Sequence, residues 1–156
     1  MLPRSRVIPL FVSNALSGQK LPLYGDGLQV RNWLYVEDHC LGILHALKKG
    51  SAGEIYNISS KTELKNIEIT RRILRILNKP VSLIERVKDR LGHDRRYAIN
   101  SSKLRKLGWL EKYSFDRTFV NTVLWNRDHE EWWKAIKKKK HFIQYYRKAY
   151  AGRGSS

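Results

Sequence analysis

Short runs of β-branched and aromatic residues alternate with helical patterns along this chain, and the alternation predicts a mixed α/β fold. Residues 9–16 carry an apolar stripe at helical spacing, and Gly18 follows as a stop signal. Residues 29–36, 54–58 and 81–87 have the composition of strands. Further helices are predicted over residues 66–77, 102–107 and 115–125.

The helix after residue 38 carries the clearest apolar stripe. Cys40, Ile43, Leu44 and Leu47 follow one another at positions i, i+3, i+4 and i+7, which places them on one helical face. Asp38 precedes them and is a plausible N-cap. We therefore expect these four side chains to face the core, with Cys40 as a buried structural thiol.

The last thirty residues differ in character from the rest. They combine the basic run Lys137–Lys140 with six aromatic side chains and read as a helical tail. We expect the aromatic rings to lie against the domain and the four lysines to be solvated. The predicted organisation is one domain over residues 1–125 and a basic, aromatic-rich tail over residues 126–156.

Composition limits the class of protein. The chain has 156 residues, 42% of them apolar, which is enough for one ordinary core and excludes an unfolded polyelectrolyte. A single cysteine excludes a disulfide scaffold and a cysteine-based zinc finger. No apolar run reaches the length of a membrane span, and no signal-peptide core follows the N-terminus, so a cytoplasmic location is expected.

The net charge of +17 points to an anionic partner without saying which kind. Basic residues interleaved with aromatic ones leave open a nucleic-acid-binding module as the alternative function. Lysine runs are more often solvated surface than a binding site. We therefore do not expect nucleic acid, and a salt titration of binding separates the two cases.

Signals for catalysis are missing from the chain. Gly25 and Gly27 form a G-x-G turn, but residue 30 is not glycine and no phosphate-binding loop is present. No tyrosine has a lysine four residues later, and the five histidines lack metal-site spacing. We expect no catalytic residue and no metal ligand.

Candidate binding residues are easier to find. Three candidates lie beside turns or strand ends: Arg31, Arg90 and His93. The guanidinium group of either arginine can meet a diphosphate in a forked arrangement. The ring of Tyr24 suits stacking on a nucleobase, and the amide of Asn57 offers a donor and an acceptor. The simpler interpretation is that Arg31 pairs with Glu37 or Asp38, that Tyr24 is core, and that residues 89–97 form a charged surface loop.

Four segments resemble one protein family in the same order. Residues 24–38 are similar to its Y-G-x-G-x-Q-x-R-x-W-x-Y-V-x-D motif, residues 53–58 to G-E-x-Y-N-I, residues 89–99 to D-R-P-G-H-D-R-R-Y-A-I, and residues 107–109 to L-G-W. The family is that of the extended short-chain dehydrogenases, and the third motif is typical of nucleotide-sugar 4,6-dehydratases, most closely those acting on dTDP-glucose. The resemblance covers about residues 4–125.

The resemblance implies a fold and a role. It places the chain in the small substrate-binding domain, without the Rossmann half that holds NAD and the catalytic Tyr-x-x-x-Lys pair. The complete enzyme removes water from dTDP-glucose to give the 4-keto-6-deoxy sugar. This chain alone is expected to be inactive, as a truncated product or as one half of a split enzyme. A separate Rossmann-containing chain is then an expected partner, and faces left open suggest self-association.

The resemblance also implies roles for individual residues. Pro22 and Tyr24 would line the base pocket, and Arg31 and Arg90 would face the diphosphate. Asn57 and His93 would hold phosphate or ribose. Arg6, followed by Val7, stands where the family has a lysine that contacts the nucleotide, and Tyr150 corresponds to a late tyrosine near the substrate. Leu91 stands where the family has proline, a departure that would loosen the loop carrying Arg90 and His93.

Overall fold

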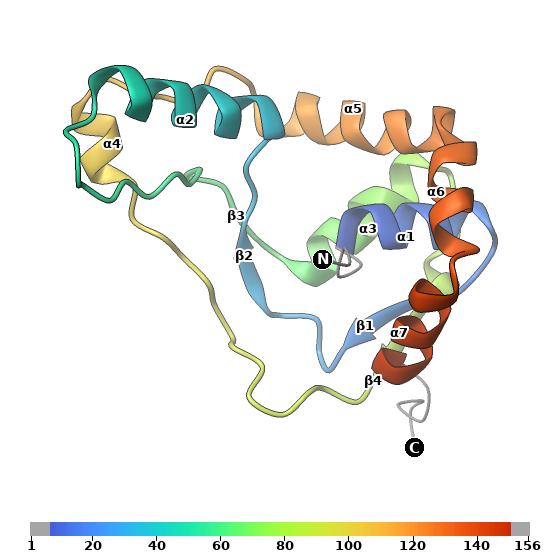
Figure 1. Cartoon of the computed structure of the whole chain (residues 1–156). Helices are drawn as coiled ribbons and strands as arrows, with labels where there is room; N and C mark the ends of the chain where they lie inside the picture. The colour runs from blue at the N-terminus through green and yellow to red at the C-terminus, as the bar shows by residue number, and fades with distance from the viewer. Residues whose placement is uncertain (1–6, 151–156) are drawn as a thin grey trace.

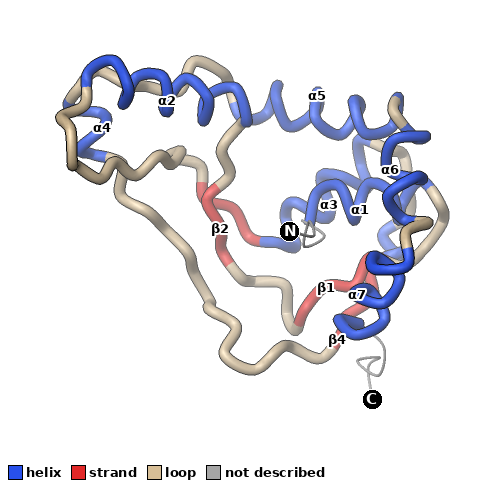
Figure 2. The backbone as a smooth tube through the Cα atoms, in the orientation of Figure 1, coloured by secondary structure: helices blue, strands red, loops and turns tan. Residues whose placement is uncertain are grey.

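The computed structural model describes residues 7–150 and confirms the mixed α/β class. Figure 1 shows the order of the elements and Figure 2 separates helix, strand and loop. The described elements are α1 (Val7–Leu16), β1 (Leu21–Tyr24), β2 (Val30–Asn32), α2 (Val36–Lys49), β3 (Glu63–Lys65), α3 (Asn66–Ile76), the 3-10 turn η1 (Val81–Leu83), β4 (Ile84–Val87), α4 (Ser102–Lys106), α5 (Phe115–Asp128), α6 (Glu130–Lys137) and α7 (Lys140–Tyr150).

The main core lies between α1, α3, α5 and β1. Leu21, Ile69, Ile73 and Val123 are fully buried there. The helical patterns predict the burial of the last three, whereas strand β1 with Leu21 was not predicted. In Figure 1 these elements form the right-hand block of the molecule, while α2 and α4 extend to the left as an arm. No helix within residues 7–150 is long and apolar enough to cross a membrane.

Two small sheets connect the block to the candidate site. β1 pairs in parallel with β4, with Leu21 opposite Ile84 and Tyr24 opposite Val87. β2 pairs antiparallel with β3. The strand predicted over residues 29–36 is too long, because β2 ends at Asn32 and α2 already begins at Val36. The strand predicted over residues 81–87 begins instead with the 3-10 turn η1.

The inner face of α2 is unlike the prediction. Its buried residues are Asp38 and Gly42, and the N-cap is Tyr35 rather than Asp38. Asp38 Oδ1 accepts a hydrogen bond from the backbone N–H of Lys112 at 2.8 Å. A Cβ on Gly42 would lie 2.7 Å from Cγ2 of Ile58, so only glycine permits this approach. The arm is therefore held by close backbone contact rather than by the apolar stripe.

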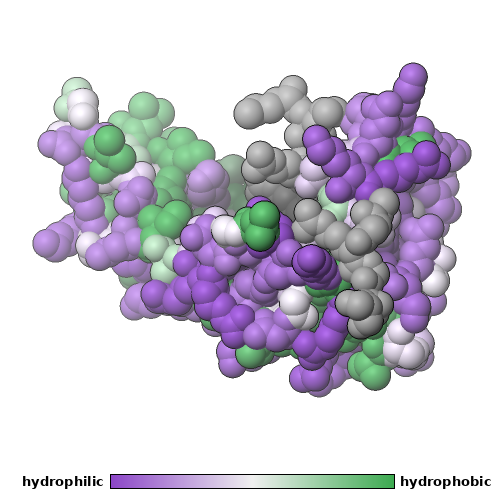
Figure 3. All heavy atoms as spheres, turned by 90° about the horizontal axis from the view of Figure 1, so that it is seen from below, coloured by the Kyte–Doolittle hydropathy of each residue, from purple (hydrophilic) through white to green (hydrophobic). Residues whose placement is uncertain are grey.

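The apolar stripe itself faces outward, which corrects the expectation of a buried Cys40. We call the exposed residues of this stripe the α2 outer face: Val36, Cys40, Ile43, Leu44 and Leu47. Leu47 is 79% and Ile43 52% exposed. Figure 3, which views the molecule from below, shows apolar side chains gathered toward the arm end. The helical period was predicted correctly, but nothing among residues 7–150 covers that side.

The strand predicted over residues 54–58 is also wrong for this structure. The segment has no strand assignment, and Ile55 is 80% exposed. A strand needs a neighbour to accept and donate its backbone hydrogen bonds, and no described segment pairs with this one. The arm thus exposes both an unpartnered helix face and, near its buried side, an unpaired extended segment.

An ion pair at the base of the arm makes the stability of the chain dependent on pH. Arg105 donates to both carboxylate oxygens of Glu111, at 2.8 and 2.6 Å, and also to the carbonyl of Ser59. The hydrogen bonds from Arg105 hold the pKa of Glu111 below its usual value. A lowered carboxyl pKa contributes stability above the ordinary glutamate pKa, and that stability is lost as the pH falls through the folded value.

We therefore expect Glu111→Gln to lower the free energy of unfolding by about 1–2 kcal/mol at pH 7 and by much less at pH 3. Urea unfolding at both pH values measures the difference. Glu85→Gln, at an exposed position with no ion pair among the described residues, is the matched control. An equal loss for Glu111→Gln at both pH values would contradict the assignment to charge.

The tail packs against the main block. Phe142, Tyr146 and Tyr150 contact the core, and Trp133 is buried with its Nε1 donating to the carbonyl of Asn126. Lys137 departs from the expected solvated run. Its Nζ reaches Asn14 Oδ1 at 2.9 Å and Gln19 Oε1 at 3.1 Å, and burial lowers its pKa. α5 continues to Asp128, past the end predicted at residue 125.

Candidate functional site

Four of the predicted binding residues come together from four separate segments. Tyr24 ends β1, Arg31 lies in β2, His93 lies in the segment after β4, and Tyr150 ends α7. The Tyr24 ring stacks on Tyr150 at 5.6 Å and meets the edge of His93 at 5.7 Å. Arg31 NH2 lies 2.9 Å from His93 Nε2. We call these four residues the Tyr24–Arg31 cluster.

Glycine turns position the first part of the cluster. Gly25 and Gly27 have φ angles of 54° and 72°, in the left-handed region that side chains disfavour. A Cβ on Gly27 would also lie 2.5 Å from Cδ2 of Leu23. The backbone N–H of Gly25 donates to the carbonyl of Val87, which continues the β1–β4 pairing into the turn. The predicted G-x-G turn thus brings Tyr24 beside the segment that follows β4.

That segment, residues 88–100, runs along the lower edge of Figure 1 and is pinned to the sheets rather than loose. Val30 exchanges backbone hydrogen bonds with Arg95 and Tyr97. Arg95 pairs with Asp26 at 2.8 Å and Arg96 with Glu63 at 2.8 Å. The charged segment is therefore a held part of the site, and its exposed arginines are mostly engaged by carboxylates.

Arg31 differs from these paired arginines. Its guanidinium donates to three neutral acceptors, the carbonyl of Val30 at 2.6 Å, His93 Nε2 at 2.9 Å and the carbonyl of Asp94 at 3.0 Å. It also lies 4.3 Å from the ring centre of Tyr97. No carboxylate within residues 7–150 contacts it, and burial lowers its pKa.

The simpler pairing of Arg31 with Glu37 or Asp38 is therefore wrong. Glu37 accepts from the hydroxyl of Tyr35, and Asp38 from the backbone of Lys112. Arg90 adds to the positive charge, because it is exposed and close enough to lower the pKa of Arg31. A half-buried guanidinium without a counter-ion, beside a second arginine, attracts an anion.

Other predicted residues lie apart from the cluster. Asn57 is exposed on the unpaired segment, and none of the contacts of the described residues links it to the cluster. Pro22 is buried in β1, and Val7 is the half-buried first residue of α1. Arg6 lies outside the described residues.

Two polar residues of the site escaped the prediction from sequence. Gln29 is 1% exposed, and its Nε2 donates to Asp89 Oδ2 at 2.9 Å and to the carbonyl of Tyr24 at 3.3 Å. Asp89 Oδ1 in turn meets His93 Nδ1 at 2.6 Å. Both residues fall inside the quoted motifs, but their contacts run through the β1–β4 pairing and no local pattern reveals them.

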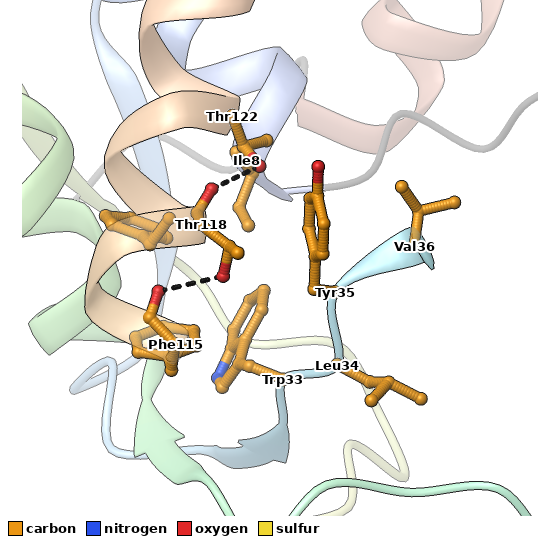
Figure 4. A pocket seen from close by; sticks show the side chains of 9 residues that line it. Ile8, Trp33, Leu34, Tyr35, Val36, Phe115, Thr118 and Thr122 are labelled. Carbon is orange, nitrogen blue, oxygen red and sulfur yellow. Dashed lines mark hydrogen bonds between the residues drawn. The ribbon is translucent and has the colours of Figure 1, made fainter. Parts of the chain in front are cut away.

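A cavity among the described residues lies elsewhere. It measures about 190 Å³ between α1, α5 and the start of α2, and Figure 4 shows Trp33 and Tyr35 facing Thr118 and Thr122. None of the Tyr24–Arg31 cluster lines it. Its walls are mainly apolar, and it offers no charge to an anion. The candidate site is therefore the open surface around Arg31, which we prefer because it carries the unpaired charge.

Comparison with known proteins gives consistent matches. A family model described as GDP-mannose 4,6 dehydratase matches residues 3–122. The dTDP-glucose 4,6-dehydratase of Streptomyces antibioticus is 42% identical over 135 residues, and that of Escherichia coli 41% identical over 143 residues. These alignments cover 86% and 84% of this chain but only 40% of each relative.

Solved structures agree. The dTDP-glucose 4,6-dehydratase of Bacillus anthracis, in complex with NAD, is 50% identical with a TM-score of 0.79 over 85% of this chain and 42% of its own. That of Streptomyces venezuelae, with NAD and TYD bound, is 45% identical with a TM-score of 0.81 over 85% and 41%. The chain thus spans about two fifths of the length of the relatives that it matches.

Proposed function

The chain belongs to the GDP-mannose 4,6-dehydratase family, and from this membership we propose that it is the nucleotide-sugar-binding portion of a dTDP-glucose 4,6-dehydratase. The single observation that carries the proposal is Arg31, a half-buried guanidinium held by neutral acceptors with no carboxylate contact among residues 7–150. A nucleotide sugar offers that guanidinium the diphosphate it lacks.

The cluster suggests how the ligand is held. Arg31 and Arg90 face the diphosphate, and the ring of Tyr24 stacks on the base beside Tyr150. His93 contacts phosphate. Four residues outside the cluster are proposed to contact the rest of the nucleotide sugar. They are Arg6, Val7, Pro22 and Asn57. On this assignment residues 1–125 carry most of the site, and the tail contributes Tyr150.

Ligand-induced stabilisation tests this function. We expect dTDP-glucose, at a concentration 100 times its dissociation constant, to add about 2.7 kcal/mol to the free energy of unfolding and so to raise the melting temperature. A single-stranded oligonucleotide tests the nucleic-acid alternative, whose binding would weaken steeply with salt. No shift with dTDP-glucose, or a shift only with the oligonucleotide, contradicts the proposal.

Catalysis requires groups from outside this chain. Within residues 7–150 the one parallel ladder between strands is that of β1 and β4, and no tyrosine and lysine have the spacing of the family's catalytic pair. The structures of the Bacillus and Streptomyces relatives contain NAD. We propose that NAD is held by the portion to which the remaining three fifths of those relatives correspond, and that this chain alone is inactive.

The α2 outer face is the surface that we propose receives that NAD-binding portion. The face is apolar, and on the same arm residues 54–58 form an extended segment that pairs with no described strand and that a neighbouring sheet would pair. A second copy of this chain is a poorer occupant, because each copy carries a charge of +17 and two copies repel. The NAD-binding portion accounts for both unpartnered features at once.

A further inference from the structure

The hydrogen bonds around His93 define its protonation in the unliganded chain. The Nη2 atom of Arg31 can only donate a hydrogen bond. His93 Nε2, which lies 2.9 Å from it, must therefore accept. His93 Nδ1 then carries the proton and donates to Asp89 Oδ1 at 2.6 Å. This hydrogen-bond pattern suits the tautomer with its proton on Nδ1, and the side chain is only 6% exposed.

Asp89 is held rigidly enough to impose this tautomer. Its Oδ2 accepts from Gln29 Nε2 at 2.9 Å, and its Oδ1 also accepts from the backbone N–H of Arg90 at 2.8 Å. Gln29 is itself buried between β1 and β2. These hydrogen bonds, with that from His93, keep the pKa of Asp89 below its usual value despite partial burial. Asp89 thus presents a fixed negative charge to Nδ1.

The groups facing His93 divide into those that oppose and those that favour a second proton. Arg31 contacts the ring and Arg90 lies nearby, and both oppose an imidazolium. Asp89 favours it. The Tyr24 ring at 5.7 Å is uncharged, and Asp94 is engaged through its carboxylate by Tyr97. The balance depends on whether the charge of Arg31 is neutralised.

From this geometry we propose that binding of the diphosphate at Arg31 is coupled to uptake of one proton by His93, with Asp89 as the positioning residue. The inference rests on the proposed function of the site. When a phosphate oxygen takes the NH2 donor of Arg31, His93 Nε2 loses its partner in a nearly buried position. A proton from solvent on Nε2 restores a hydrogen bond, now donated to phosphate, and makes the bond to Asp89 charge-assisted.

Coupled protonation has a defined sign. Because a proton is taken up on binding, binding is favoured by acid. The dissociation constant should rise by up to tenfold per pH unit on the alkaline side. dTDP-glucose is the suitable ligand for the measurement, because each of its phosphates bears one fixed charge and does not titrate near neutral pH.

Isothermal titration of dTDP-glucose in two buffers of different ionisation enthalpy, at several pH values, measures the protons taken up. We expect an uptake approaching one per ligand for the unmodified chain. His93→Gln keeps an acceptor but cannot titrate, and should bind with no uptake and no dependence on pH. Asp89→Asn keeps an acceptor oxygen but loses the charge, and should show reduced uptake with weaker binding in acid.

His39→Gln is the matched control, since His39 is exposed on α2 away from the cluster, and it should leave the uptake unchanged. Binding without uptake in the unmodified chain, or uptake that persists in His93→Gln, overturns the proposal while leaving the proposed function intact. No binding of dTDP-glucose at all overturns the proposed function and this inference together. Circular dichroism of each variant separates a local effect from loss of the fold.

Discussion

Replacing Arg31 with glutamine is expected to weaken binding of dTDP-glucose by about 100-fold or more, the effect typical of truncating one partner of a partly buried charge pair. The loss follows from the contacts of Arg31, which leave its positive charge without a carboxylate within residues 7–150. Arg31→Lys should recover only part of the affinity, because an ammonium cannot form the forked contact. Isothermal titration measures both variants.

The same substitution should lower the free energy of unfolding of the unliganded chain by about 1–2 kcal/mol, because the half-buried guanidinium donates hydrogen bonds to three acceptors. Circular dichroism checks that the variant remains folded. Arg71→Gln removes an identical charge from an exposed position on α3 and is the matched control. It should bind within about threefold of the unmodified chain. Equal affinities for Arg31→Gln and Arg71→Gln would show that the diphosphate does not meet Arg31.

Charges placed on the α2 outer face should have little effect on the isolated chain and a large effect on a complete enzyme. The suitable protein for this test is a fusion in which the NAD-binding portion of the Escherichia coli dTDP-glucose 4,6-dehydratase precedes this chain. We expect the fusion to convert dTDP-glucose, and the double variant Ile43→Glu, Leu47→Glu to lower its turnover by about 100-fold or more, because burying unpaired carboxylates costs several kcal/mol.

In the isolated chain the double variant should change the free energy of unfolding by only about 0.5 kcal/mol, because Ile43 and Leu47 are exposed there. The matched control is Val81→Glu, Ile143→Glu, which alters two exposed apolar positions on other elements. A folded, NAD-binding fusion that does not turn over dTDP-glucose, or one that tolerates charges on the α2 outer face, contradicts the proposed docking.

Local patterns predicted the core well because the core is built from helices whose period records which side is covered. Ile69 and Ile73 of α3 and Val123 of α5 are buried as expected. The same reasoning placed the stripe of α2 inward, and there it failed. The period is a property of the helix, whereas the covered side depends on what lies against it, and no described residue lies against Leu47.

The site was predictable in part. Tyr24, Arg31 and His93 follow from residue chemistry and from the resemblance, and the structure brings them together. The hydrogen bonds that hold them were not predictable, since Gln29 and Asp89 are 60 residues apart in the chain and meet only through the β1–β4 pairing. Periodicity reports on neighbours within one element and is silent about such pairs.

The β1–β4 ladder has a kinetic consequence. It joins residues 21–24 directly to residues 84–87. The loop formed by the residues between these strands must therefore close before the strands can pair. Closing a loop of that length is slow relative to forming a helix, because its entropy must be lost before any contact compensates for it. Asp89 and His93 follow β4 directly, so this ladder brings them beside Tyr24. We therefore expect the binding surface to assemble after α1 and α3 have formed, so that a partly folded chain lacks the ligand site.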